Sequence, residues 1–153
     1  TTEIYTLSLH DALPIWNSGG QGPLLFLLID DNHDLAEAHA LFLRGMGHAA
    51  ETAPTGLKGL EAAAALRPDV VLCDLKLPDM PGLALAHALR SRAEMEGAII
   101  CVLSALSDGE LRMLRHSDAK RTVDFWISKP LTREWVDRLQ AKHASLHGKL
   151  QQA

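Results

Sequence analysis

Five polar side chains in this sequence belong to types that, brought together, could hold a metal ion and a phosphoryl group. They are three carboxylates, a hydroxyl and an amine, at Asp30, Asp31, Asp74, Ser104 and Lys129. Three crowded carboxylates repel one another and need a hard cation, and Mg²⁺ prefers such oxygen ligands. A lysine and a hydroxyl beside them suit a phosphoryl group, whose oxygens need positive charge and hydrogen-bond donors. The combination predicts a site where a phosphate meets a carboxylate.

Each of these groups comes directly after a short, mostly apolar run. The runs span 24–29, 70–73, 98–103 and 123–128. Runs of this length and composition are typical of strands that are buried on both faces of a parallel sheet. Because the carboxyl ends of parallel strands meet at one edge of the sheet, we expect the five side chains to lie close together.

The remaining sequence supplies the other elements that such a sheet needs. A weaker strand is expected at 48–53, and helical patterns follow every strand, the last of them from residue 132 onward. Five successive strand–helix pairs favour an α/β fold with right-handed crossovers and helices on both faces. The loop after Asp74 contains Pro78, Pro81 and Gly82, which prevent the strand from continuing. Asp79 is expected to shape this loop rather than to join the site.

With these motifs on one sheet edge, residues 24–147 resemble the receiver domain of bacterial two-component response regulators. The matching elements are the acidic pair after the first strand, Asp-x-x-x-Pro with a glycine four residues beyond the proline, the hydroxyl after the fourth strand, and Lys-Pro after the fifth. The resemblance implies a flavodoxin-like (βα)5 fold, a doubly wound parallel sheet with strand order 2-1-3-4-5.

The resemblance also implies a set of metal ligands. Asp31 and Asp74 would bind Mg²⁺ directly, and Asp30 would bind it through a water molecule. The backbone carbonyl of Lys76 would complete the protein ligands.

The same resemblance assigns the phosphoryl chemistry. Asp74 would be the phosphoacceptor, Lys129 would neutralise the phosphoryl group next to a cis bond to Pro130, and Ser104 would donate a hydrogen bond to it. Ser104 would also be a switch residue, together with Trp126, which stands where the family usually has a rotating tyrosine or phenylalanine.

These roles describe a signalling switch rather than an enzyme. Asp74 would take the phosphoryl group from the phosphohistidine of a histidine kinase or a histidine phosphotransfer protein. The domain would catalyse only its own phosphorylation and a slow dephosphorylation. The new charge would change the surface of the fourth helix, the fifth strand and the fifth helix, to which a downstream protein would bind.

Two departures from the family pattern carry expectations of their own. Leu106, two residues beyond Ser104, and Lys76, two beyond Asp74, occupy positions that tune dephosphorylation in receivers. We expect the apolar Leu106 to limit access of water and so to make the phosphoryl state long-lived. The stretch from Lys120 to Val123 stands where the family often has a Gly-Ala turn, so the exit from the fourth helix is expected to differ.

Alternatives to a free-standing receiver make different demands on the sequence. The domain could be a module of a hybrid histidine kinase, or a degenerate receiver that binds a protein without being phosphorylated. A phosphatase with an aspartyl intermediate would need Asp-x-Asp, whereas Asp74 is followed by Leu75 and Lys76. A dinucleotide-binding domain would need G-x-G-x-x-G after the first strand, which is absent. His143 and His147 lie one helical turn apart and are expected to be exposed helix positions rather than metal ligands.

Composition limits the partners and the compartment. The chain has 153 residues, 47% of them hydrophobic, which fits one globular domain. A net charge of −4 offers no basic field for nucleic acid, and no apolar run is long enough to span a bilayer. We therefore expect no direct nucleic-acid partner and no membrane association. Cys73 and Cys101 lie in apolar runs, where buried free thiols suit a cytoplasmic protein.

The two ends of the sequence are expected to lie outside the domain. Residues 1–15 resemble the conceptual translation of a common sequencing adapter, residue for residue, and are treated as an artefact. Residues 16–23 are interpreted as a linker, 24–147 as the receiver domain and 148–153 as a C-terminal tail. On this interpretation the sequence does not define the native N-terminus.

Overall fold

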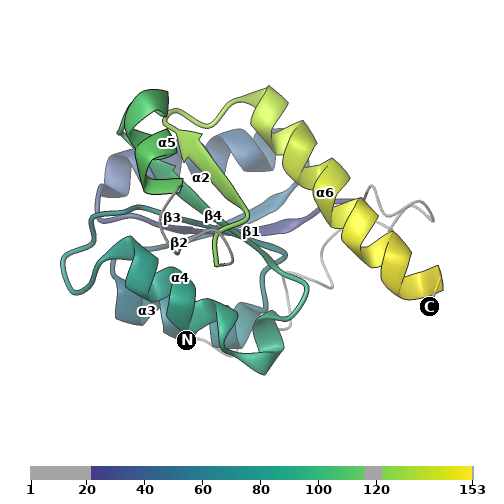
Figure 1. The fold of residues 1–153 in the computed structure, drawn as a ribbon. Helices are drawn as coiled ribbons and strands as arrows, with labels where there is room; N and C mark the ends of the chain where they lie inside the picture. The colour runs from purple at the N-terminus through teal and green to yellow at the C-terminus, as the bar shows by residue number, and fades with distance from the viewer. Residues whose placement is uncertain (1–21, 116–121, 153) are drawn as a thin grey trace.

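The computed structural model describes residues 22–115 and 122–152 of the chain. The expected artefact at 1–15 and most of the expected linker therefore lie outside the described residues. Strands and helices alternate along the described part (Figure 1). In chain order they are β1 (Leu25–Ile29), α2 (His33–Gly45), β2 (Ala49–Ala53), α3 (Gly56–Leu66), β3 (Val70–Cys73), α4 (Gly82–Arg90), the short 3₁₀ helix η1 (Ala93–Met95), β4 (Ile99–Ser104), α5 (Asp108–Arg115), β5 (Phe125–Ser128) and α6 (Arg133–Gln152).

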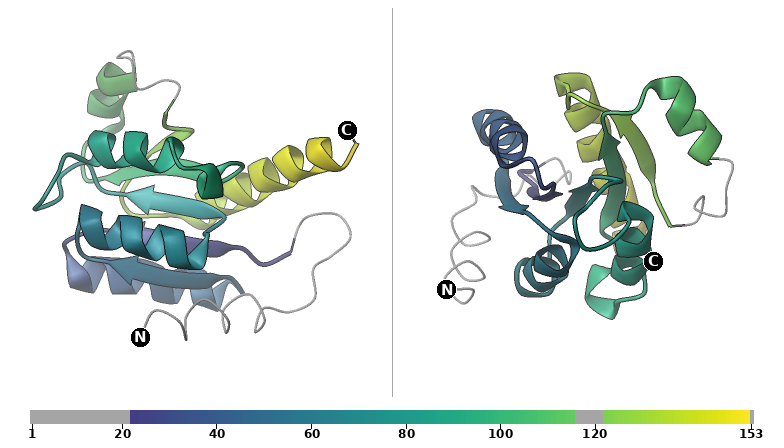
Figure 2. Two further views of the ribbon diagram at one scale, coloured as in Figure 1. Left: turned by 90° about the horizontal axis from the view of Figure 1, so that it is seen from below. Right: turned by 90° about the vertical axis from the view of Figure 1, so that its left-hand side faces the viewer.

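The five strands form one parallel sheet with the order β2-β1-β3-β4-β5, which confirms the predicted fold class. Ile29 at the end of β1 pairs with Cys73 at the end of β3, and Ser104 at the end of β4 pairs with Ser128 at the end of β5. The helices cover both faces of this sheet (Figure 2): α2 and α6 pack on one face, and α3 and α4 on the other. Strands β1 and β3 therefore end at the same level, and β4 and β5 end two residues further along at the same edge of the sheet.

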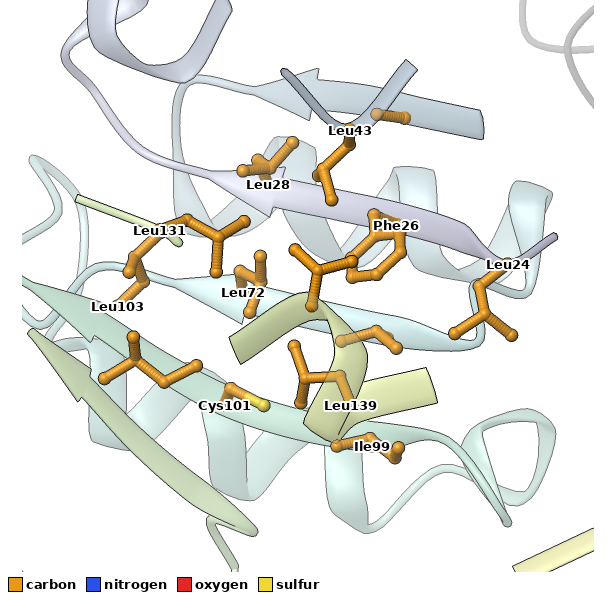
Figure 3. Close-up of a cluster of buried hydrophobic side chains, with 14 of the residues drawn as sticks. Leu24, Phe26, Leu28, Leu43, Leu72, Ile99, Cys101, Leu103, Leu131 and Leu139 are labelled. Carbon is orange, nitrogen blue, oxygen red and sulfur yellow. The ribbon is translucent and has the colours of Figure 1, made fainter. Parts of the chain in front are cut away.

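The interior strand β1 is buried along its whole length because the side chains on its two faces belong to two separate cores. Phe26 and Leu28 point into the core beneath α2 and α6 (Figure 3), whereas Leu27 and Ile29 point into the core beneath α3 and α4. Burial of each such side chain contributes about 1.5–3 kcal/mol. This alternation explains why the sequence shows a continuous apolar run here instead of a polar face.

Side-chain caps fix where three of the helices begin. Asn32 accepts a hydrogen bond from the Leu35 N–H at 3.1 Å before α2, and Thr55 accepts one from the Lys58 N–H at 3.1 Å before α3. Ser107 before α5 forms a capping box with Glu110, whose carboxylate accepts the Ser107 N–H at 2.9 Å. Such caps stabilise a helix by about 1 kcal/mol each.

Two details differ from the sequence-based expectations. β5 begins at Phe125 rather than at 123, because the Asp124 carboxylate accepts the Ile100 N–H at 2.9 Å and also binds Arg90. Helix α6 continues to Gln152, through residues that were expected to form a tail. The stretch 120–123, where the exit from the fourth helix was expected to differ from the family pattern, lies partly outside the described residues.

The expectation that His143 is exposed was wrong. Its side chain is only 4% exposed, with Nε2 3.3 Å from Asp69 Oδ1 and its ring 4.0 Å from that of His147. Helical spacing alone did not reveal that this face of α6 meets the loop before β3. None of the helices in the described ranges combines the length and the apolar character that crossing a membrane requires.

Candidate functional site

The acidic cluster forms where β1 and β3 end side by side. The Asp74 N–H donates to the Ile29 carbonyl at 2.9 Å, which extends the β1–β3 pairing to the first residue of the loop. Asp30, Asp31 and Asp74 each place one carboxylate oxygen within 4.8 Å of the others. Asp30 is buried, Asp74 is half-buried and Asp31 is exposed, so the cluster opens towards solvent on one side. Oxygen ligands at this separation are the kind of set that Mg²⁺ prefers.

Lys129 brings a positive charge into the same cluster from the end of β5. Its Nζ donates to Asp30 Oδ2 at 2.6 Å and to Asp74 Oδ2 at 3.2 Å. Burial by itself lowers the pKa of Lys129, but the hydrogen bond to Asp30 and the charges of Asp74 and Asp30 outweigh it, and the net pKa is raised. The ammonium therefore stays charged at neutral pH. The Lys129–Pro130 bond is cis, as the resemblance implied.

The loop between Asp74 and α4 is tightly folded. A Cβ added at Gly82 would collide with the backbone carbonyl oxygen of Asp74, so no other residue fits there without a shift of the backbone. The Gly82 N–H donates to the Leu75 carbonyl at 2.8 Å, and Lys76 forms an isolated antiparallel bridge with Pro81. The Lys76 N–H lies 3.4 Å from Asp74 Oδ1. The role of the Lys76 carbonyl as a metal ligand stays a prediction.

Asp79 lies outside the carboxylate cluster, in agreement with the expectation that it shapes the loop. Its two oxygens accept hydrogen bonds from the Gly56 N–H at 2.8 Å and the Leu57 N–H at 2.9 Å, at the beginning of α3. The hydrogen bonds from Leu57 and Gly56 lower the pKa of Asp79.

Ser104 lies at the same sheet edge and is buried. Its hydroxyl accepts the Leu106 N–H at 3.3 Å, and its carbonyl accepts the Lys129 N–H at 2.8 Å. Ser128, which the sequence analysis did not single out, donates its hydroxyl to the Leu106 carbonyl at 2.8 Å. The Leu106 backbone is thus held on both sides by a serine. A hydroxyl directly before the strand-end lysine was the only signal that could have pointed to Ser128.

Trp126 does not belong to the carboxylate cluster. It is half-buried on β5 and lines a pocket of about 360 Å³ between α5, β5 and α6. Phe125 and Trp135 line the same pocket, and the Arg138 guanidinium stacks 4.1 Å from the centroid of the Trp135 ring. This is the face on which the sequence analysis placed a partner.

This fold and this arrangement of side chains match the family model described as the response regulator receiver domain, over residues 26–139. The match covers most of the chain, and the chain belongs to the response regulator receiver family. The family assignment drawn from the motifs is therefore confirmed.

Curated relatives match this chain over about half of their own length. The probable transcriptional regulatory protein TcrX of Mycobacterium tuberculosis is 38% identical over 120 residues, which is 78% of this chain and 49% of the relative. The DNA-binding response regulator MtrA of Mycobacterium leprae is 35% identical over 117 residues, which is 76% of this chain and 49% of the relative. The chain thus spans about half the length of the curated relatives it matches.

Solved structures support the fold. A CheY-like receiver domain from Methylobacillus flagellatus superimposes with a TM-score of 0.70 at 24% identity, covering 80% of this chain and 99% of the other. The response regulator TrrA of Thermotoga maritima, solved in complex with Mg²⁺ and BeF, gives a TM-score of 0.66 at 23% identity, covering 77% of this chain and 97% of the other.

The expectation of no direct nucleic-acid partner is contradicted by these relatives. MtrA is named a DNA-binding response regulator, and TcrX and KdpE are named transcriptional regulatory proteins. The net charge of this chain describes only the part that is shared with these relatives, so it could not exclude a nucleic-acid partner.

Proposed function

We propose that this chain is a phosphoacceptor domain of a two-component phosphorelay, with Asp74 as the residue that is phosphorylated. The observation that carries the proposal is the Lys129 ammonium, which bridges Asp74 and Asp30 within a cluster of three carboxylates. The cluster offers oxygen ligands for one Mg²⁺, and the ammonium offers a charge for the phosphoryl oxygens. The same residues would have no shared purpose in a protein that only binds another protein.

In the proposed reaction, an Asp74 oxygen attacks the phosphorus atom of a phosphohistidine. The new O–P bond forms as the P–N bond breaks, and the imidazole of the donor leaves. Asp30, Asp31 and Asp74, with the Lys76 carbonyl, would hold Mg²⁺, which supplies positive charge for the transferring oxygens. Lys129 offsets the remaining charge from the side of β5.

The aspartyl phosphate then acts on the loop after β4. Ser104 gives up its hydrogen bond with the Leu106 N–H when its hydroxyl turns to the phosphoryl group. The resulting shift of the loop changes the pocket face of α5, β5 and α6, where Trp126 lies, and so changes its affinity for a partner. The domain is a switch that modifies only itself, and Leu106 slows the loss of its phosphoryl group.

The relatives favour a particular kind of output. Because MtrA is named a DNA-binding response regulator, we infer that the full protein links this switch to DNA binding by a region outside the matched half. A cytoplasmic location follows from that output. A receiver module of a hybrid histidine kinase is the second candidate, and a degenerate receiver is the third.

The proposal is tested by incubating the chain with acetyl phosphate and Mg²⁺ and measuring its intact mass. We expect the mass of one phosphoryl group to be added, only with Mg²⁺ present, and to be absent from an Asp74→Asn variant. Tryptophan fluorescence should change under the same conditions, since Trp126 and Trp135 line the pocket face. An unmodified wild-type chain would favour the degenerate receiver instead.

A further inference from the structure

Asp79 ties the loop after the proposed phosphoacceptor to a helix that contributes no proposed ligand. Both of its oxygens are occupied, one by the Gly56 N–H and the other by the Leu57 N–H. These N–H groups belong to the first turn of α3, where backbone donors lack partners inside the helix and the helix dipole favours a negative charge. The side chain is exposed, so this two-point contact is not a by-product of core packing.

The loop is fixed at two further points. A Cβ added at Gly56 would lie 2.6 Å from the Met80 side chain, so the loop packs directly on the start of α3. At the other end, Gly82 packs on the Asp74 carbonyl group. Lys76 lies between these two anchors and is bridged to Pro81, next to Met80. Movement of the Asp79 anchor would therefore be passed to the backbone of Lys76.

We propose that Asp79 is a positioning residue for Mg²⁺ binding, because it holds the loop against α3 and so fixes the backbone of Lys76. The inference rests on the proposed function, in which the Lys76 carbonyl is a metal ligand. A metal-binding carbonyl that is already held in place loses no conformational freedom when the metal binds. Ordering a loose loop costs free energy and so weakens metal binding. Residues that orient metal ligands typically change metal affinity about 10- to 100-fold when removed.

A cap that only stabilised α3 would look similar in the structure, but this chain provides a matched control. Thr55 caps the same helix by accepting the Lys58 N–H at 3.1 Å. Both Asp79→Ala and Thr55→Ala remove a cap from the first turn of α3, but only Asp79→Ala also removes a contact between the loop and α3.

The test is the Mg²⁺ dissociation constant of the full chain, measured by titration calorimetry, alongside urea unfolding. We expect Asp79→Ala to raise the dissociation constant about tenfold, and Thr55→Ala to lower the urea midpoint without changing the dissociation constant. Asp79→Asn keeps one accepting oxygen and should show a smaller loss of affinity than Asp79→Ala. Equal losses of affinity in Thr55→Ala and Asp79→Ala would overturn the inference.

Measurements at high salt distinguish a positioning role of Asp79 from a simple effect of its negative charge. Removal of a nearby acidic group can weaken cation binding through long-range attraction, which high ionic strength screens. We expect the effect of Asp79→Ala to persist at high salt, and its disappearance would also overturn the inference. A wild-type chain that bound no Mg²⁺ would instead remove the proposed function, and the inference with it.

Discussion

At the scale of single residues, Lys129 has two opposing effects on the site. Its ammonium lies 2.6 Å from Asp30 and 3.2 Å from Asp74, so it relieves the repulsion among the carboxylates. A metal ion would be attracted by the same carboxylates. In the proposed reaction the Lys129 ammonium would therefore stabilise the phosphoryl group but compete with Mg²⁺ for the carboxylates.

Substitution of Lys129 by methionine should separate these two effects. We expect Lys129→Met to bind Mg²⁺ more tightly, about tenfold, because one unit charge within a few ångströms of the site is removed. Phosphorylation by acetyl phosphate should become much slower. Calorimetry and intact-mass kinetics measure the two quantities, with Lys129→Arg as the variant that keeps the charge. Weaker Mg²⁺ binding in Lys129→Met would contradict the argument.

Leu106 provides a second prediction at this scale. Its side chain is apolar and half-buried, and its backbone is held by hydrogen bonds with Ser104 and Ser128. Leu106→Glu should shorten the lifetime of the aspartyl phosphate roughly tenfold, because a carboxylate can orient a water molecule for attack. The lifetime is read from the decay of the phosphorylated mass after acetyl phosphate is removed. Leu106→Ala is the control for lost bulk, and an unchanged decay in Leu106→Glu would refute the role of Leu106.

At the scale of elements, the two serines at the ends of β4 and β5 share one task. Ser104 holds the Leu106 N–H and Ser128 holds the Leu106 carbonyl, so the loop after β4 is tied to both strands. In the proposed switch, phosphorylation breaks only the hydrogen bond between the Ser104 hydroxyl and the Leu106 N–H. The Ser128 bond then opposes any larger movement of the loop.

Ser128→Ala should therefore lower the free energy that is needed to move the loop after β4. One hydrogen bond is worth about 0.5–1.5 kcal/mol, so the half-saturating concentration of beryllofluoride should fall about two- to tenfold. Tryptophan fluorescence in the presence of Mg²⁺ measures this concentration. Ser128→Thr keeps the hydroxyl and should behave like the wild type. An unchanged or higher value in Ser128→Ala would show that the bond does not restrain the loop.

Some features of these elements could be predicted from the sequence, and others could not. The continuous apolar run of β1 and the carboxylates after β1 and β3 were predictable, because strand burial and strand-end position follow from local pattern. The Ser128–Leu106 contact and the burial of His143 were not, since each depends on which loop meets which helix in space. The start of β5 was misjudged because a side chain, Asp124, replaced the expected backbone pairing.

At the scale of the whole molecule, two buried histidines link stability to pH. The Nδ1 atom of His48 accepts the Leu24 N–H at 2.9 Å, and the Nε2 atom of His39 accepts the Leu131 N–H at 3.3 Å. Burial is the main cause that lowers the pKa of both residues. The unfolded chain, with ordinary histidines, therefore binds more protons than the folded chain below a pH of about 6.5.

The free energy of unfolding should thus be largest above pH 6.5 and should fall as the pH drops below it. Urea unfolding at pH 7.5 and pH 5.5 measures the difference. His48→Asn, whose side-chain oxygen can accept the same N–H, should reduce the difference. His87→Asn changes an exposed histidine and should not. A difference that is equal in all three proteins would exclude His48 as a source of the pH dependence.

The order of the elements along the chain determines when the domain becomes complete during its synthesis. Of the described elements, β1 is synthesised first and α6 last, yet Val136 and Leu139 of α6 complete the core to which Phe26 and Leu28 of β1 belong. Lys129 also arrives only after β5. A nascent chain released before these residues would lack both the last layer of that core and the cation of the site.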